Sequence, residues 1–251
     1  MRFYDIFNGD ADGLCALQQL RLAQPCEATL VTGAKRDILL LDRVTAMAGD
    51  RLTVLDISLD ANRAGLMRAL DAGAHCRYFD HHFAGTVPVH PLLEAHVDTS
   101  AAVCTSLIVD RHLGGRHRAW AVVAAFGDNL QQAALDAART LHPAPADLRL
   151  LRELGECLNY NAYGESVADL HFRPEDLFRG MQAYADPLVF AREAPAFATL
   201  RAARDADLAQ ARTLREERPA DGCVAVFLPQ AAWCRRVSGA FANELAQKYP
   251  D

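Results

Sequence analysis

Short apolar segments and longer amphipathic segments alternate through residues 3–79 of this 251-residue chain. The apolar segments have the length and composition of buried strands and cover residues 3–7, 28–32, 52–58 and 75–79. The segments between them have helical periodicity and cover residues 14–24, 37–48 and 61–72. This alternation predicts an α/β fold, a parallel doubly wound sheet with helices on both faces, because parallel strands need helical crossovers.

Acidic residues and histidines follow three of the four predicted strands. Asp10 and Asp12 lie in the turn after the first strand, and Asp56 ends the third. Residues 80–82 (Asp-His-His) follow the fourth, and a glycine-marked corner farther along adds Asp128. Right-handed crossovers place all strand-to-helix turns at one edge of the sheet, where open α/β sheets bind their ligands. We therefore expect these side chains to converge.

So many carboxylates at one edge would repel one another unless cations neutralised them. Carboxylates mixed with imidazoles suit Mn²⁺, Mg²⁺ or Zn²⁺ better than Ca²⁺ alone. Two divalent ions about 3.5–4 Å apart could hold both the attacking and the leaving oxygen of a phosphoryl displacement. The sequence therefore indicates a two-metal centre for phosphoryl chemistry.

The composition is that of an ordinary globular protein, with 51% hydrophobic and 23% charged residues. The net charge of −6 disfavours extensive binding of duplex DNA, which requires a basic surface, but allows a small anionic substrate held by metal ions. No apolar run reaches the roughly 20 residues that span a bilayer, so no membrane partner is expected. The absence of a signal peptide and the seven scattered cysteines favour the cytoplasm.

Beyond residue 130 the pattern changes to consecutive helical segments. We divide the chain into an α/β core, a helical connector and the start of a second small α/β domain, over residues 1–130, 131–218 and 219–251. The boundary is the Pro-Ala-Asp-Gly turn at 219–222, followed by a predicted strand at 223–228 and a helix at 238–248. One strand and one helix are too few for an independent domain, so we expect the chain to continue beyond Asp251.

The segments that contribute the acids resemble the motifs of the DHH phosphoesterase superfamily. They are the Asn-Gly-Asp-Ala-Asp-Gly turn, an acid at the end of the third strand, a literal Asp-His-His and a later Gly-Asp. The superfamily includes RecJ-type single-strand exonucleases, nanoRNA and pAp phosphatases, cyclic-dinucleotide phosphodiesterases and family II inorganic pyrophosphatases. The resemblance implies a catalytic core over residues 1–130, completed by the connector, with a DHH-associated substrate-binding domain starting at 219.

The resemblance also implies that two metal ions share one set of ligands. Asp10 would bind the first ion and Asp12 the second, and Asp56 would bridge them. His81 and Asp128 would complete the second site. The implied ions are Mn²⁺, with Mg²⁺ or Co²⁺ as alternatives.

Other motif residues would act on the substrate. His82 would be the catalytic group that faces the scissile phosphate, and Asp80 would orient a neighbouring histidine. Asp98, Thr99 and Ser100 resemble a polar loop that several members use near the substrate.

The chain departs from the superfamily pattern in two places. Many members have a histidine shortly before the first motif acid, whereas here Asn8 stands two residues before Asp10. Asn8 is then either a weak ligand or a turn residue, and the first ion would be held weakly or mainly with substrate. The glycine-rich motif of the associated domain does not occur before Asp251, so the groups that grip the far end of the substrate cannot be named.

Three further positions give weaker signals. Asn161 lies in a polar-aromatic segment, residues 159–164, which interrupts the predicted helices, and Arg236 precedes a predicted helix start. Either could contact the substrate. Lys35 and Arg36 follow the second strand and could meet a phosphate, but we expect a solvated turn there.

The leading hypothesis is Mn²⁺-dependent hydrolysis of phosphate esters in short nucleotide substrates: oligonucleotides, linear or cyclic dinucleotides, or pAp. One alternative is a RecJ-type 5′ single-strand-specific exonuclease. Another is a non-catalytic binding module that keeps the fold. The sequence does not specify the bond that is cut, and it leaves a homodimer open.

Overall fold

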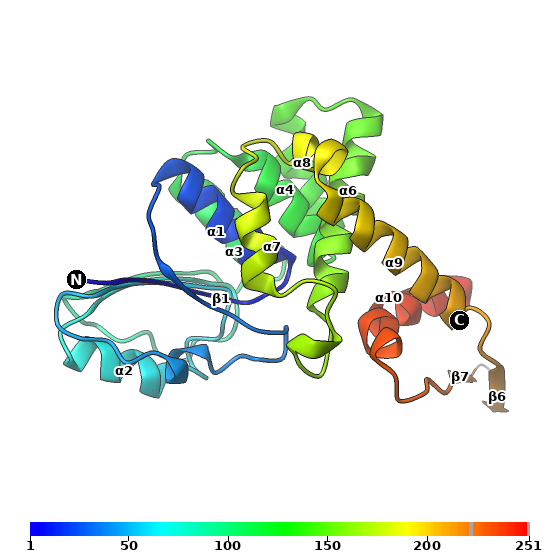
Figure 1. Ribbon diagram of the computed structural model, residues 1–251, viewed down its shortest axis with the longest axis horizontal. Helices are drawn as coiled ribbons and strands as arrows, with labels where there is room; N and C mark the ends of the chain where they lie inside the picture. The colour runs from blue at the N-terminus through cyan, green and yellow to red at the C-terminus, as the bar shows by residue number, and fades with distance from the viewer. Residues whose placement is uncertain (221–222, 250–251) are drawn as a thin grey trace.

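The computed structural model describes residues 1–220 and 223–249 and contains one parallel sheet (Figure 1). Its five strands are β1 (Phe3–Phe7), β2 (Thr29–Val31), β3 (Arg51–Leu55), β4 (His75–Asp80) and β5 (Leu93–Val97). They lie in the order β2-β1-β3-β4-β5, and all neighbouring pairs are parallel. The predicted doubly wound α/β class is therefore confirmed. The strand order reverses beside β1, which is where such sheets bind ligands.

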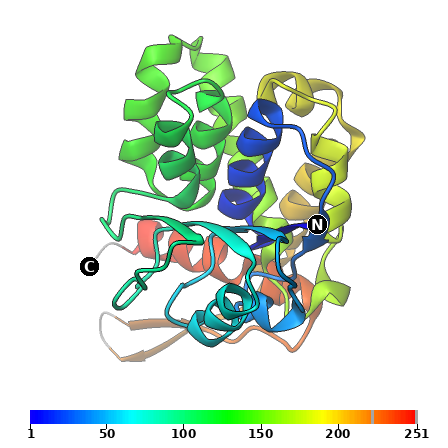
Figure 2. The same cartoon turned by 90° about the vertical axis from the view of Figure 1, so that its left-hand side faces the viewer.

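Alternate residues of each strand point to opposite faces of the sheet and contribute to two separate cores. Phe7 and Leu55 pack toward one set of helices, namely α1 (Ala11–Ala23), α3 (Thr105–His112) and α4 (Arg118–Gly127). Ile6 and Val54 pack toward α2 (Arg63–Asp71). Figures 1 and 2 show the sheet between α2 and the larger helical layer.

A second group of helices extends the larger core. It consists of α5 (Gln131–Ala138), α6 (Pro145–Ala162), α7 (Pro174–Met181), α8 (Pro187–Glu193) and α9 (Pro195–Ala211). Helix α4 lies against α1, α5 and α6, and every residue from Trp120 to Gly127 is buried. Four of these helices begin with proline, whose fixed φ suits the first helical position. Short 3₁₀ turns lie at Leu40–Arg43, Arg139–Leu141 and Val167–Asp169.

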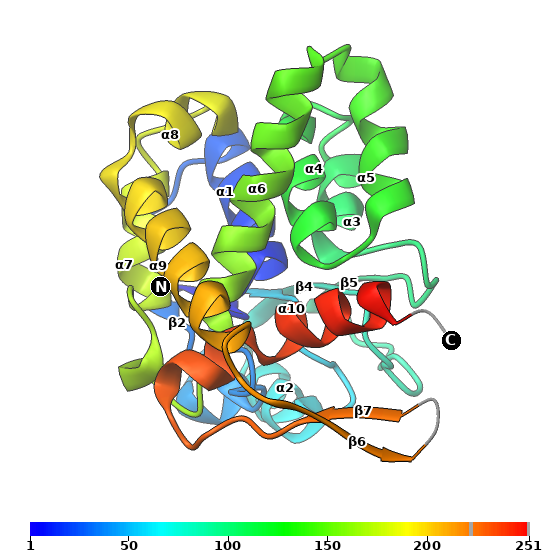
Figure 3. The ribbon, with the colours of Figure 1, turned by 90° about the vertical axis from the view of Figure 1, so that its right-hand side faces the viewer.

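The C-terminal segment forms a hairpin and a helix (Figure 3). Strands β6 (Glu216–Ala220) and β7 (Cys223–Val226) pair antiparallel, and α10 (Ala232–Lys248) packs against α9 and α6. Phe241 of α10 joins a small core with Tyr160 of α6. The strand and the helix predicted after residue 222 are both present, and the start of a second domain at residue 219 stays a prediction. Asp221 and Gly222 of the predicted turn lie outside the described residues.

The prediction of a helix over residues 37–48 is wrong, because this segment contains only a short 3₁₀ turn, at Leu40–Arg43. The side chain of Asn62 explains the difference. Its amide donates to the Ile38 carbonyl (2.7 Å) and accepts from the Leu41 N–H (3.2 Å). A side chain that binds these backbone groups competes with the helical pattern.

Two other helix boundaries also differ from the expectation. Asp98, Thr99 and Ser100 also have the residue types of a helix start, but the helix begins at Thr105, because the Asp98 carboxylate instead closes a turn with the residue two positions on. The expected break at 159–164 lies later, since α6 continues to Ala162.

The cysteines and the apolar content of the helices are two further features of the described residues. All seven cysteines are free thiols, and five of them are buried, as expected for small apolar side chains. Among the helices of residues 1–220 and 223–249, none combines the length and the apolar composition needed to cross a bilayer.

Candidate metal centre

The turn between β1 and α1 brings Asp10 and Asp12 to the carboxyl edge of the sheet. Asp10 caps α1, and its Oδ1 accepts hydrogen bonds from the N–H groups of Asp12 (3.0 Å) and Gly13 (3.1 Å). Both glycines of the turn are required by close packing. A Cβ at Gly9 or at Gly13 would lie 2.1 Å from a backbone carbonyl oxygen.

Asp56 reaches the same place from the end of β3. Its backbone is left-handed, with φ 60°, a conformation that aspartate adopts more readily than most residues. Its Oδ1 accepts a hydrogen bond from the Thr105 hydroxyl at 3.1 Å. Asp56 is therefore held by the first turn of α3.

His81 lies at the centre of the acidic residues. Its Nε2 is 3.4 Å from Asp56 Oδ1, 3.8 Å from Asp128 Oδ2 and 3.9 Å from Asp12 Oδ2. These carboxylates come from three different parts of the chain: Asp12 lies in the first turn of α1, Asp56 follows β3 and Asp128 follows α4. The predicted convergence at the carboxyl edge is therefore observed for these four residues.

The N-terminus of α3 fixes the Asp12 carboxylate. Asp12 Oδ2 accepts from the Thr105 N–H and Oδ1 from the Ser106 N–H, both at 2.7 Å. The Ser106 hydroxyl also donates to the Asp12 carbonyl at 2.9 Å. Free N–H groups at a helix start favour a negative charge, so this contact keeps Asp12 oriented at the centre.

Two of the carboxyl groups hold their protons unusually tightly. Burial and the charges of Asp12 and Asp10 raise the pKa of Asp128 to about 7. The same causes raise the pKa of Asp56 well above its usual value. A divalent cation between these groups would favour their ionised forms.

Asp10 shows the opposite behaviour because of Lys35. Burial opposes ionisation of Asp10, but the Lys35 charge and hydrogen bond outweigh it and lower the pKa to about 2. Lys35 Nζ lies 2.6 Å from Asp10 Oδ2 and 3.8 Å from Asp128 Oδ1. Burial likewise opposes the charge on Lys35, yet Asp10 raises its pKa. The expectation that Lys35 lies in a solvated turn is wrong.

Asp80 and His82 form a separate pair beside the acidic centre. Asp80 is fully buried, and its Oδ1 lies 2.8 Å from His82 Nδ1 and accepts the His82 N–H at 3.2 Å. Its Oδ2 accepts from the Leu59 N–H at 3.2 Å. The hydrogen bond to Asp80 raises the pKa of His82. Since Nδ1 is held by Asp80, Nε2 of this partly exposed ring is left for another partner.

The donor set fits a divalent metal ion. Two overlapping groups each offer ligand atoms within 4.8 Å of one another, namely Asp12-His81-Asp128 and Asp56-His81-His82. Carboxylate oxygens with one or two imidazole nitrogens match the preferences of Mn²⁺ and related ions. The raised pKa values of Asp56 and Asp128 agree with a site that needs positive charge.

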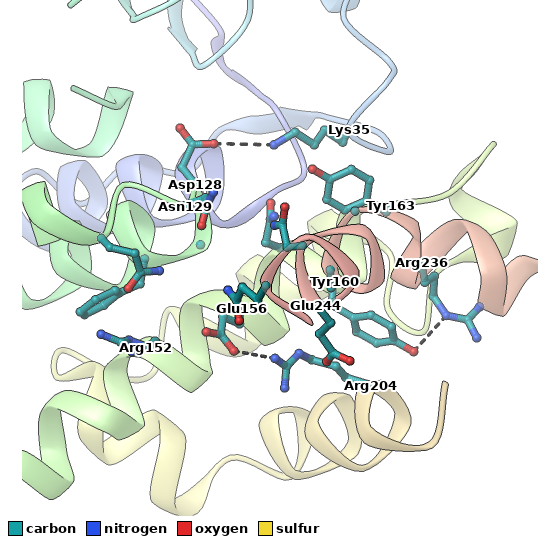
Figure 4. A pocket seen from close by; sticks show the side chains of 18 residues that line it. Lys35, Asp128, Asn129, Arg152, Glu156, Tyr160, Tyr163, Arg204, Arg236 and Glu244 are labelled. Carbon is teal, nitrogen blue, oxygen red and sulfur yellow. Dashed lines mark hydrogen bonds and ion pairs between the residues drawn. The ribbon is translucent and has the colours of Figure 1, made fainter. Parts of the chain in front are cut away.

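A pocket of about 610 Å³ opens beside Asp128 and Lys35 (Figure 4). It runs along α6 to α10, where Arg236 lies at the far side. Other basic and aromatic residues that line it are Arg152, Tyr160, Tyr163 and Arg204. Its volume is in the range of small-molecule sites, and it shares Asp128 and Lys35 with the acidic centre.

The weaker candidates Asn161 and Asn8 make extensive contacts with the backbone. The buried amide of Asn161 donates to the Phe172 carbonyl (2.9 Å) and accepts from two backbone N–H groups. Asn8 accepts from the Asp10 N–H (3.3 Å) and donates to the Lys35 carbonyl (3.3 Å). These contacts favour positioning roles, and substrate or metal contact by either residue stays a prediction.

The remaining candidates lie on two sides of the centre. Asp98 follows β5, accepts from the Ser100 hydroxyl (2.6 Å) and pairs with Arg111 (2.7 Å), while Thr99 and Ser100 are exposed. Contact of this loop with substrate stays a prediction. Arg236 lines the pocket but also pairs with Asp207 at 2.8 Å. Its contact with substrate likewise stays a prediction.

Sequence reasoning missed Thr105, Ser106 and Arg152. Thr105 and Ser106 lie in an apolar stretch, and no local signal shows that their N–H groups meet Asp12 of the neighbouring helix α1. The Arg152 guanidinium lies 5.0 Å from the centre of the Phe126 ring at the pocket wall, and its buried Nε has no partner among the described residues. The only sequence signal for Arg152 is a basic residue on the face of α6 that lines the pocket.

The sequence matches no protein-family model and no curated protein. Solved structures match it in fold. A crystal structure of exonuclease RecJ bound to manganese matches 99% of this chain and 73% of its own, with a TM-score of 0.56 and 19% identity. RecJ from Thermus thermophilus in complex with Mn²⁺ matches 98% of this chain and 42% of its own, with a TM-score of 0.53 and 20% identity. The chain therefore shares the fold of these RecJ structures.

Proposed function

We propose that this protein is a metal-dependent phosphoesterase that hydrolyses phosphate esters in nucleotides. The observation that carries the proposal is the position of His81 Nε2, which lies 3.4–3.9 Å from carboxylates of three separate elements. Such a set of oxygen and nitrogen donors at the ligand edge of an α/β sheet suits a catalytic divalent cation. The manganese in both RecJ structures supports Mn²⁺ as that ion.

Asp12, Asp56, His81 and Asp128 would hold the metal. A bound ion would supply positive charge for the phosphoryl oxygens and would favour the ionised forms of the buried acids. The protein contributes the orientation. The α3 N-terminus fixes Asp12, and the Thr105 hydroxyl fixes Asp56.

His82 is the proposed proton donor and charge stabiliser at the scissile phosphate. Asp80 holds Nδ1 at 2.8 Å, which fixes the ring and leaves Nε2 for the substrate. The raised pKa of His82, caused first by the bond to Asp80, increases its protonated fraction near neutral pH. An imidazolium there would donate a proton to the leaving oxygen.

The pocket supports a short nucleotide substrate. It is limited to about 610 Å³, and two of its arginines are already paired, Arg204 with Glu156 at 2.5 Å and Arg236 with Asp207 at 2.8 Å (Figure 4). The groups proposed to bind phosphate are Lys35 and Arg152, which both line the pocket. The acidic net charge of the chain agrees with a small substrate rather than a long duplex.

A RecJ-type 5′ single-strand exonuclease is the second candidate. It is favoured by the fold match to two RecJ structures. Processive digestion of long single strands with a steep dependence on salt would identify this activity, because the phosphate backbone would then dominate binding. We also propose a cytoplasmic location, which the free cysteines support.

A substrate screen tests the proposal. Purified protein with Mn²⁺ would be assayed against dinucleotides, pAp, pyrophosphate and long single-stranded DNA. We expect release of a mononucleotide or of phosphate from a short substrate, and none from a variant that combines Asp80→Ala with His81→Ala. Equal activity in that variant, or no hydrolysis of any substrate by the unaltered protein, would contradict the proposal and favour a non-catalytic module.

A further inference from the structure

The ammonium group of Lys35 lies among the acidic side chains of the centre. Its Nζ is 2.6 Å from Asp10 Oδ2. It is also 3.8 Å from Asp128 Oδ1 (Figure 4). The Tyr163 ring lies on another side, with its centre 5.4 Å from Nζ. Two carboxylates and an aromatic face are the surroundings of a bound cation, and here the cation belongs to the protein itself.

Both carboxylate oxygens of Asp10 accept hydrogen bonds within the chain. Its Oδ1 accepts the N–H groups of Asp12 and Gly13, and its Oδ2 accepts from Lys35. The helix start and the ammonium together compensate its charge. A divalent ion at Asp10 would have to share this carboxylate with the ammonium, whose positive charge opposes its binding.

The backbone of Lys35 is held from both sides. Its N–H donates to the Ala162 carbonyl at 3.0 Å, and its carbonyl accepts from the Asn8 side chain at 3.3 Å. Asn8 in turn accepts from the Asp10 N–H. The Asn8 side chain therefore orders both the turn that carries Asp10 and the segment that carries Lys35. The contact between Asp10 and Lys35 is thus fixed by the backbone around them.

Asp12 and Asp56 accept hydrogen bonds from the start of α3, but neither is paired with a basic side chain. In the described residues no lysine or arginine nitrogen lies within 4.0 Å of a carboxylate oxygen of Asp12 or Asp56. Asp128 lies between the two environments, 3.8 Å from both Lys35 Nζ and His81 Nε2. The carboxylates near His81 are therefore the ones that need a cation from solution.

The choice of lysine is chemically suited to this place. The chain has 26 basic residues but only two lysines, Lys35 and Lys248. An ammonium is a compact charge with three rotatable donors, whereas a guanidinium is a planar fork. Of the two, the ammonium resembles a small metal cation more closely in size and shape.

We propose that Lys35 takes the place of one of the two cations and that the centre binds a single divalent ion, held by Asp12, Asp56, His81 and Asp128. The inference rests on the metal-dependent function proposed above. Lys35 also lines the pocket, so its remaining N–H donates to a phosphate oxygen of the bound substrate.

Metal stoichiometry tests this assignment. Metal-free protein would be saturated with Mn²⁺ in equilibrium dialysis, with the ions counted per chain and located by anomalous scattering in crystals. The unaltered protein should bind one ion, beside His81. A Lys35→Met variant should bind two, the second at Asp10. The control Lys248→Met changes the other lysine, which is exposed and pairs with Glu216, and should bind one ion with unchanged activity.

Each other result has a defined meaning. Two ions in the unaltered protein, with Lys35 displaced from Asp10, would overturn the inference and leave the proposed function intact. A single ion in Lys35→Met would overturn the role of Lys35 in excluding the second. No bound ion, together with no hydrolysis, would overturn the proposed function as well. The count in the unaltered protein decides the question even if Lys35→Met fails to fold.

Discussion

Asp10 and Asp128 are carboxylates near the same edge of the sheet, yet their pKa values differ in opposite directions from the usual one. The charge of Lys35 and the hydrogen bonds that Asp10 accepts from Lys35 and Gly13 lower the pKa of Asp10 to about 2. Asp128 is only 3.8 Å from the same ammonium, but burial and neighbouring carboxylates raise its pKa to about 7. The charge of a buried acid is thus decided by the nearest cation rather than by burial alone.

The comparison divides the centre into two halves. The Asp10 half is neutralised by groups of the protein, and the His81 half offers ligands without a matching protein cation. Metal dependence should therefore be concentrated in the second half. Four predictions test this difference.

The largest effect is expected for Asp56→Asn. The amide keeps the size of the side chain but cannot carry the negative charge that attracts a divalent ion. We expect loss of Mn²⁺ binding in calorimetry and hydrolysis below detection. Asp42→Asn, which alters an exposed acid paired with Arg68, is the control and should keep both. Retained Mn²⁺ binding in Asp56→Asn would place the metal elsewhere.

Asp80→Asn should reduce kcat by about 10–100-fold while Mn²⁺ still binds. The reason is that His82 loses the carboxylate that fixes Nδ1 and raises its pKa. The alkaline limb of the kcat profile should therefore move to lower pH. Glu94→Gln is a matched control, since it removes a carboxylate bonded to His96 at 2.6 Å outside the centre. An unchanged profile in Asp80→Asn would exclude His82 as the proton donor.

Mn²⁺ affinity should fall as the pH drops below about 7. In the metal-free protein Asp128 has a raised pKa of about 7, so it is protonated below this pH and ionised above it. The ion must displace that proton, which weakens binding by about tenfold per pH unit for each proton released. Calorimetry in buffers of different ionisation enthalpy counts the protons. Affinity that is constant between pH 5 and 8 would contradict the raised pKa.

The smallest effect is expected for Arg152→Ala, which should raise KM for a short nucleotide by about tenfold and leave kcat and Mn²⁺ affinity unchanged. Arg152 lines the pocket but is not part of the acidic centre. Arg149→Ala on the exposed side of α6 is the control. An equal loss in both variants would show a general charge effect rather than a phosphate contact.

The sequence by itself determined the sheet and most of the acidic centre. Strands were predictable because their apolar runs are short and bounded by turn residues, and β1 has the predicted bounds. Asp10, Asp12, Asp56 and His81 were predictable because parallel strands carry their loops to one edge. Helix boundaries were less predictable where side chains such as Asn62 and Asp98 bind backbone groups.

Only the tertiary structure decided how the centre is charged. Lys35 is 25 residues from Asp10 in sequence, and Thr105 is 93 residues from Asp12, so no local pattern links these pairs. Their contacts depend on how the β2–β3 connection and α3 pack over the sheet edge. Electrostatic energies change steeply with distance in a buried site, which is why residue types alone could place the carboxylates but not their protons or their cations.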